Sequence, residues 1–229
     1  LARRTVRAVG GSILAAEQAL EHGLACHLAG GTHHAHYDYP AGFCIFNDLA
    51  IISQYLLQSG RVNRVLIFDC DVHQGDGTAE ILAADPSVFT FSMHGEKNYP
   101  FQKEKSDLDI ELPDGTGDAE YLTLLDKSLS RIEQCFTPDL VLYVAGLDVH
   151  QADRLGKLAL SDDGIEQRDR MVLQWAQQRK LPVAAVMAGG YFPDLDHLTD
   201  LQLGVIERLA EALNVVPASL LECLEDGSQ

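Results

Sequence analysis

The chain has 229 residues, of which 46% are hydrophobic, so it is long enough for one large domain with a substantial core. Its formal net charge is −17. The acidic charge argues against direct nucleic-acid binding. An acidic surface can attract cationic partners such as lysine-rich peptides or polyamines, and the alternative is that the carboxylates serve only solubility. No apolar run reaches the roughly 18 residues of a membrane helix, and the basic N-terminus is not followed by the apolar core of a signal peptide.

Short apolar runs alternate with longer amphipathic stretches along the chain. The predicted strands span residues 24–29, 64–69, 87–92, 139–145 and 183–188. The predicted helices span residues 5–22, 47–59, 76–84, 118–135, 162–179 and 198–213. Apolar strands that are separated by helices favour a parallel sheet covered on both faces. The predicted class is therefore α/β, with a single doubly wound domain over residues 1–229.

Two segments fall outside this alternation. Residues 95–117 form the longest polar stretch and are predicted to be an irregular excursion. The acidic C-terminal tail spans residues 214–229, and the part after Val216 is predicted to be a capping helix with a frayed end.

The five cysteines are scattered along the chain without any CxxC pair. An odd, scattered set is typical of buried free thiols rather than of disulfides or a zinc site with cysteine ligands. Free thiols indicate a reducing compartment, so we expect a cytoplasmic protein.

Glycine, polar and metal-binding residue types follow the ends of the predicted strands. GGTHH follows the first strand, CDVHQGDG the second and MHG the third, while GLDVHQADRLG and GGYFPD follow the last two. In open α/β sheets, ligands bind outside the carboxyl ends of the strands. We therefore expect the functional site at this edge.

The segment DCDVHQGDG, residues 69–77, places Asp69, Asp71 and His73 at alternate positions. On an extended strand end these side chains share one side. Carboxylate and imidazole groups suit zinc, and a catalytic zinc has three protein ligands and an open position for water. Acidic residues at strand ends also cap helices, so this motif alone leaves both interpretations open.

A third ligand candidate follows the strand at 139–145. In AGLDVH, Asp148 is preferred because it lies nearer the strand end, and His150 is the alternative. With a zinc ion in place, His33 and His34 are predicted to act as general base and acid on the water and the leaving group. A loop histidine pair without chemistry is the alternative.

Histidines in that role need carboxylate partners on their far ring nitrogens, and Asp69 and Asp76 are free for this. Tyr191 follows two glycines at another strand end, where its phenol can donate a hydrogen bond to an oxyanion. Tyrosines after glycines are common in loops, so Tyr191 by itself is a weak signal.

Four ordered motifs together resemble the zinc-dependent histone deacetylase family: GGTHHAHYDYPAGFCIFND, VLIFDCDVHQGDGT, AGLDVHQADRLGKLALSDDGI and MAGGY. HQG, DRLG…LS and GGY are similar to its class IV branch and bacterial relatives. The resemblance spans about residues 5 to 210. It implies an arginase-like three-layer α/β sandwich.

The resemblance also implies the roles of individual residues. One catalytic zinc ion would have the ligands Asp71, His73 and Asp148. The catalytic residues would be His34 as general base and acid, His33 as an electrostatic group, Asp69 and Asp76 as their partners, and Tyr191. The acyl tunnel would be formed by Phe43, by Tyr99 as a less certain opposite wall, and by Gly42, Gly189 and Gly190. A structural K⁺ or Na⁺ ion would be held near Asp69, Asp71, His73 and Ser92.

The implied reaction is hydrolysis of an acyl-lysine amide, with an acylated lysine peptide or protein, or an acylated polyamine, as the substrate. Relatives carry several dozen residues before the segment that resembles Leu1–Gly11, so the resemblance predicts that the family's N-terminal segment is missing. One alternative is a ureohydrolase-like enzyme with two manganese ions, and another is an inactive truncated binding fragment. The sequence fixes neither the acyl length nor the oligomeric state.

Overall fold

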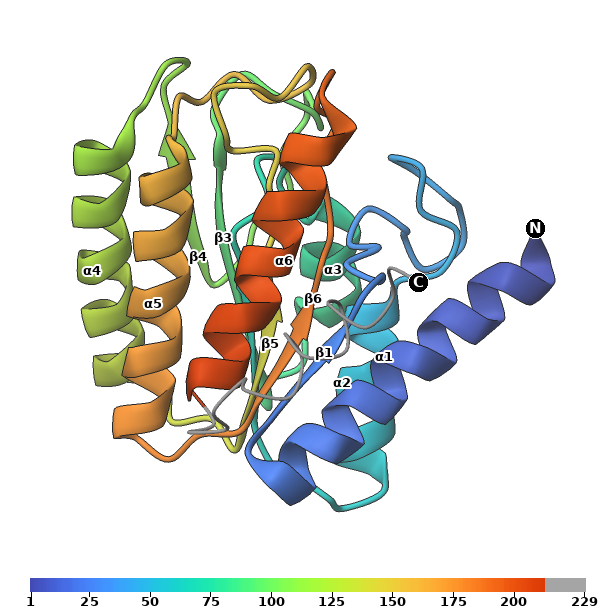
Figure 1. Ribbon diagram of the computed structural model, residues 1–229. Helices are drawn as coiled ribbons and strands as arrows, with labels where there is room; N and C mark the ends of the chain where they lie inside the picture. The colour runs from blue at the N-terminus through green and yellow to red at the C-terminus, as the bar shows by residue number, and fades with distance from the viewer. Residues whose placement is uncertain (213–229) are drawn as a thin grey trace, which may run out of the picture.

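Six parallel strands form one sheet in the computed structural model, which describes residues 1–212 (Figure 1). The strand order is β1-β6-β5-β2-β3-β4. The strands are β1 (Leu24–His27), β2 (Val65–Asp69), β3 (Val88–Gly95), β4 (Leu108–Leu112), β5 (Leu140–Val144) and β6 (Val183–Val186). The helices are α1 (Ala2–His22), α2 (Asp48–Gln58), α3 (Asp76–Leu82), α4 (Asp118–Cys135), α5 (Asp162–Gln178) and α6 (Leu195–Ala212).

Helices cover both faces of the sheet, so the molecule has three layers (Figure 1). Successive side chains of a strand face opposite layers. In β2, Leu66 and Phe68 pack into the core shared with α4, α5 and α6, whereas Val65 and Ile67 pack into the core shared with α1, α2 and α3. Burial on both faces explains why residues 65–68 of β2 form an unbroken apolar run. The predicted α/β class and covered parallel sheet are confirmed.

One element of the prediction was wrong. The polar stretch 95–117 contains β4, which pairs in parallel with β3 at the edge of the sheet. The sequence of β4 is LDIEL, in which Leu108 and Leu112 are buried and Glu111 is exposed. Charged residues are common on edge strands. In β4 the alternation of apolar and charged residues spans only five positions, so the sequence was interpreted as a polar loop.

Other differences concern the ends of elements. Helix α1 begins at Ala2 and α6 at Leu195, each three residues earlier than predicted. Such boundaries are the least certain part of any assignment from sequence. The acidic tail, with its predicted capping helix, lies outside the described residues.

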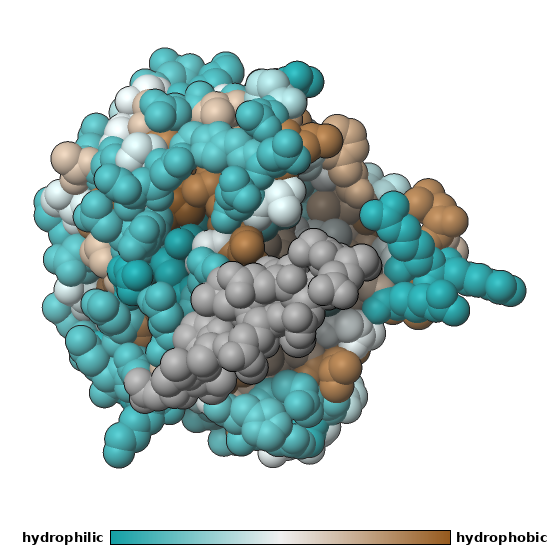
Figure 2. Space-filling view, viewed as in Figure 1, coloured by the Kyte–Doolittle hydropathy of each residue, from teal (hydrophilic) through white to brown (hydrophobic). Residues whose placement is uncertain are grey.

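The layer of α4, α5 and α6 presents a mostly hydrophilic outer surface (Figure 2). Helix α5 illustrates the pattern, because Ile165 and Val172 are buried while Asp163 and Arg170 are exposed. Within residues 1–212, no helix has the length and apolar character needed to cross a membrane.

A buried ionic cluster connects this helical layer to the sheet. The carboxylate of Asp169 accepts hydrogen bonds from the Tyr143 hydroxyl at 2.6 Å, Nε of Arg168 at 2.9 Å and Nη2 of Arg208 at 2.8 Å. Arg168 also donates to the carbonyl of Gly146, two residues before Asp148. The cluster therefore supports the loop that carries a predicted metal ligand.

Replacing Asp169 with alanine is expected to lower the free energy of unfolding by about 3–5 kcal/mol, because two buried guanidinium groups lose their counter-charge. Urea denaturation followed by circular dichroism measures this change. An exposed carboxylate on α4, Asp126, provides the control, and its replacement with alanine is expected to change the free energy by less than about 0.5 kcal/mol. Equal stabilities of the two variants would contradict the role of the cluster.

Candidate active site

The loops that follow β1, β2, β3, β5 and β6 meet around a cavity of about 530 Å³. Parallel strands place their carboxyl ends at one edge of the sheet, so segments that are distant in sequence converge there. The lining includes many of the predicted site residues: His33, His34, Gly42, Phe43, Asp71, His73, Tyr99, Asp148, Gly189 and Tyr191.

Two buried carboxylates and one imidazole lie together in the cavity wall. Nδ1 of His73 lies 3.0 Å from Oδ1 of Asp71 and 3.2 Å from Oδ2 of Asp148. Burial, followed by the charge of Asp71, raises the pKa of Asp148 to about 7. A divalent cation would offset the repulsion between these carboxylates. One atom from each residue lies within 4.8 Å of the others, and this nitrogen and oxygen donor set fits zinc.

Backbone amide groups hold both carboxylates in place. Val72 donates to Oδ1 of Asp148 at 2.9 Å, and Gly189 donates to Oδ2 of Asp71 at 2.9 Å. A Cβ atom on Gly189 would lie only 1.9 Å from Oδ2 of Asp148, so this position has no room for a side chain. The glycine after β6 thus lets its backbone approach the two carboxylates.

The histidine pair lies in the same cavity, with ring centroids 4.1 Å apart. Nδ1 of His33 lies 2.6 Å from Oδ2 of Asp69, and Nδ1 of His34 lies 2.6 Å from Oδ1 of Asp76. Nε2 of His33 lies 3.9 Å from Oδ1 of Asp71. The structure therefore brings together both predicted histidine–carboxylate pairs and one of the predicted zinc ligands.

The two histidines differ in charge. Burial opposes a charge on His33, but the carboxylates of Asp69 and Asp71 outweigh it and raise the pKa to about 9. Burial and the charge of His33 lower the pKa of His34 to about 4, against the hydrogen bond with Asp76. At neutral pH, His33 is protonated and His34 is neutral. Because Nδ1 of His34 donates to Asp76, its Nε2 carries no proton and accepts a hydrogen bond from Nε2 of the protonated His33 at 3.1 Å.

A third histidine extends this arrangement. Nε2 of His36 lies 3.3 Å from Oδ2 of Asp76, and its Nδ1 lies 2.5 Å from Oε2 of Glu80. Asp76 therefore contacts two histidines, one of which does not line the cavity. The HHAH spacing was visible in the sequence, but Glu80 lies on α3, and its contact with His36 depends on the fold.

Two further residues position the histidine loop and were missed in the sequence. The side-chain amide of Asn47 donates to the carbonyls of His33 and Ala35 at 3.2 and 3.1 Å. Oδ1 of Asp48 accepts from the amide and the hydroxyl of Thr32 at 2.8 and 2.7 Å. An Asn-Asp pair before an apolar stretch indicates a helix N-terminus. The sequence therefore explained Asn47 and Asp48 as the start of a helix and gave no sign of their hydrogen bonds to the histidine loop.

Tyr191 also lines the cavity, and its side chain is partly exposed. Its backbone amide donates to Oδ2 of Asp153 at 2.5 Å, and its carbonyl accepts from the amide of Arg154 at 3.3 Å. Burial, followed by the charges of Asp71 and Asp148, raises the pKa of the phenol to about 12. The phenol is therefore protonated at neutral pH and can donate a hydrogen bond.

Aromatic side chains form much of the remaining cavity wall. The ring of Tyr99 lies 4.9 Å from that of His34, at an angle of 81°. Phe43 is 89% exposed, and the centroid of its ring lies 6.4 Å from that of Tyr191. The backbone of Phe43 is in the left-handed region, with a φ of 66°. A left-handed backbone costs a non-glycine residue about 1–3 kcal/mol and often occurs at functional sites. Beside it, Gly42 has a φ of 50°, and a Cβ there would lie 2.2 Å from the His34 ring.

Three further residues that were predicted for the site do not line the cavity. Gly190 does not line the cavity, and a Cβ there would lie 2.9 Å from Leu198 on α6. His150, the alternative ligand, lies beside Asp162 and His197 rather than with Asp71. Ser92 is buried beside Asp69 in the β2–β3 register, so it lies near the other residues named for a monovalent cation.

The family model described as "Histone deacetylase domain" matches residues 1–205. The chain belongs to the histone deacetylase family. This match confirms the resemblance seen in the four motifs.

Three known proteins are similar to the chain. An uncharacterised protein of Picosynechococcus sp. is 54% identical over 86% of this chain and 65% of its own length. Histone deacetylase 2 of Arabidopsis thaliana is 38% identical over 80% of this chain and 48% of its own length. The crystal structure of acetylpolyamine aminohydrolase from Burkholderia pseudomallei matches 91% of this chain and 63% of that one, with a TM-score of 0.77 and 26% identity. This histone deacetylase-family chain thus spans about half to two thirds of these relatives.

Proposed function

We propose that the chain is a zinc-dependent deacylase that hydrolyses the amide of an acylated lysine side chain or an acylated polyamine. The observation that carries the proposal is one cavity lined by Asp71, His73 and Asp148 and by the His33–His34 pair, with Tyr191 in the same wall. Membership of the histone deacetylase family supports this interpretation.

The three ligands Asp71, His73 and Asp148 would hold the ion. Zinc bound there would polarise the acyl carbonyl and activate a water molecule. His34 is neutral, so it accepts a proton from the attacking water and returns it to the leaving nitrogen as the C–N bond breaks. The products are a carboxylate and a free amine. His33 stays protonated and contributes positive charge beside the developing oxyanion.

Tyr191 completes the chemistry, because its protonated phenol can donate a hydrogen bond to the oxyanion. Phe43 and Tyr99 would flank the acyl-lysine stem, since an apolar tunnel suits its methylene chain.

The net charge of −17 favours cationic substrates, which both acyl-lysine peptides and acylated polyamines provide. Ser92, with Asp69 beside it, would contribute to a K⁺ or Na⁺ site.

Replacing Tyr191 with phenylalanine is expected to lower kcat by about 10²–10³-fold, because the variant lacks one donor to the oxyanion. We expect KM to change little, since the aromatic ring remains. The assay uses acyl-lysine peptides from acetyl to long-chain, together with an acetylated polyamine, and zinc-loaded protein.

Tyr37 provides the matched control, because it is exposed and does not line the cavity. The Tyr37→Phe variant is expected to retain wild-type rates. Turnover that is equal in Tyr191→Phe and wild type would exclude the proposed role of the phenol. The acyl length with the highest rate would identify the substrate class.

A further inference from the structure

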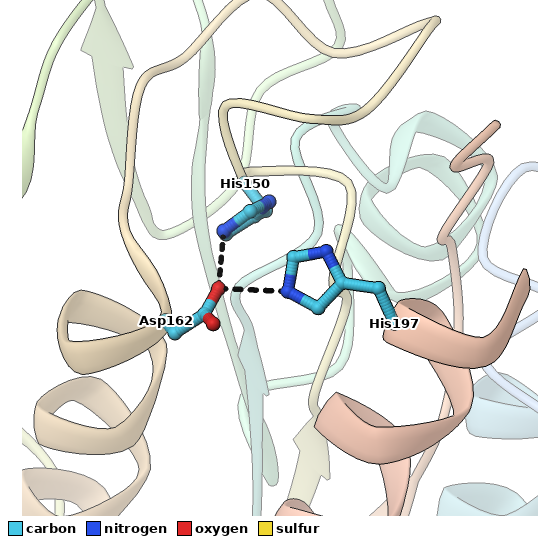
Figure 3. A group of neighbouring side chains, drawn as sticks. All are labelled: His150, Asp162 and His197. Atoms are coloured by element: carbon cyan, nitrogen blue, oxygen red, sulfur yellow. Dashed lines mark hydrogen bonds and ion pairs between the residues drawn. The ribbon is translucent and has the colours of Figure 1, made fainter. Parts of the chain in front are cut away.

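Three metal-binding side chains form a second cluster outside the catalytic cavity. His150 follows β5, Asp162 is the first residue of α5, and His197 lies in the first turn of α6 (Figure 3). Oδ1 of Asp162 lies 2.8 Å from Nε2 of His150 and 3.0 Å from Nε2 of His197. The deacylase chemistry uses none of these residues.

The His150 ring is only 1% exposed, and Nε2 has no hydrogen-bond partner within residues 1–212. The nearby oxygen of Asp162 does not satisfy it, because the N–H direction is poorly aligned with that oxygen. Ligands of one metal ion are oriented in this way, since each is directed at the ion rather than at its neighbour. A buried, unpartnered nitrogen that faces a carboxylate and a second imidazole therefore indicates a ligand.

We propose that His150, Asp162 and His197 form a second, structural site for a divalent transition metal. Two imidazoles and one carboxylate suit zinc, cobalt or nickel. Magnesium and calcium prefer oxygen ligands, of which this cluster supplies too few. Asp162 and His197 are partly exposed, so water can complete the coordination from the solvent side.

The amide of Ala152 donates to Nδ1 of His150 at 3.1 Å. This contact fixes the ring with Nε2 directed at the cluster and places the ring proton on Nε2. A metal ion at Nε2 takes the place of that proton, so the ring proton would move to Nδ1 and the hydrogen bond from the Ala152 amide would be lost. Metal titrations are performed at mildly alkaline pH, because a metal ion binds imidazole in its neutral form.

The site would connect three segments next to Tyr191. Phe192 follows Tyr191 in the chain, and its ring stacks on His150 with centroids 5.0 Å apart. The same ring meets His197 at 5.5 Å. An ion that joins the loop after β5 to the starts of α5 and α6 would hold the Tyr191 segment between them. The proposal concerns metal binding and stands independently of the deacylase activity.

The test counts bound Co²⁺ per chain after dialysis and records the visible spectrum of the bound ion. We expect two equivalents in the wild type, one in His197→Gln, one in Asp148→Asn and none in the double variant. The loss of a ligand is expected to weaken Co²⁺ binding at this cluster by about 100-fold or more. Asp162→Asn provides a second variant at an exposed side chain, with the same expected loss.

His22→Gln is the matched control, because His22 is an exposed histidine at the end of α1. This variant is expected to keep both equivalents. Cooperative urea unfolding verifies that each variant is folded. A single equivalent in the wild type that disappears in Asp148→Asn would overturn the proposal, as would two equivalents in His197→Gln.

Discussion

Replacing Asp148 with asparagine is expected to remove both zinc binding at the cavity and turnover of acyl-lysine peptides. Asparagine keeps the shape and the oxygen that accepts from the Val72 amide, but lacks the charge that balances a cation. Zinc affinity should fall by more than about 100-fold. Loss of the ion costs several kcal/mol of transition-state stabilisation, which corresponds to about 10³-fold or more in rate.

Zinc binding is measured by competition with a chromogenic chelator, and turnover by acetate release. The control is Asp126→Asn, which removes an exposed carboxylate on α4 and should match wild type in both assays. Because Asp148 is fully buried, urea unfolding has to show that the variant is folded. Wild-type rates from folded Asp148→Asn would rule out this residue as a metal ligand.

Replacing His34 with alanine is expected to lower kcat by about 10²–10⁴-fold with zinc content unchanged. His34 is the neutral member of the pair, and its ring is held by Asp76 at 2.6 Å, so its removal eliminates the proton acceptor. None of the three proposed zinc ligands is altered. Steady-state kinetics at neutral pH and metal analysis of the same sample separate these effects.

His36→Ala is the matched control for this variant. His36 also contacts Asp76, but it does not line the cavity, so its removal is expected to have a much smaller effect on kcat. Equal losses in both variants would show that both histidines act through Asp76. A loss of less than tenfold in His34→Ala would exclude it as the general base.

Much of the fold and the cavity could be predicted from the sequence for two physical reasons. Strands buried on both faces are mostly apolar, and residues 65–68 of β2 and all of β5 form unbroken apolar runs. The carboxyl ends of parallel strands share an edge, so the segments after β1, β2, β3, β5 and β6 converge there. Asp71, His73 and Asp148 meet for this reason.

The remaining features depend on contacts that sequence patterns do not encode. Two of the five residues of the edge strand β4 are charged, so its sequence resembles a polar loop. Asp153 holds the amide of Tyr191 across 38 residues, and no local spacing indicates that pairing. His150 was predicted only as the alternative to Asp148, because its partners Asp162 and His197 lie on helices whose packing is visible only in three dimensions.

The most direct measurement is acetate release from an acetyl-lysine peptide while zinc is returned to chelator-treated, folded protein. We expect no turnover before zinc is added, a rate that rises as zinc is restored, and no rise in Asp148→Asn. Full turnover by the metal-free chain would contradict zinc-dependent deacylation. So would a folded, zinc-loaded chain that cleaves none of the acyl-lysine peptides and no acetylated polyamine.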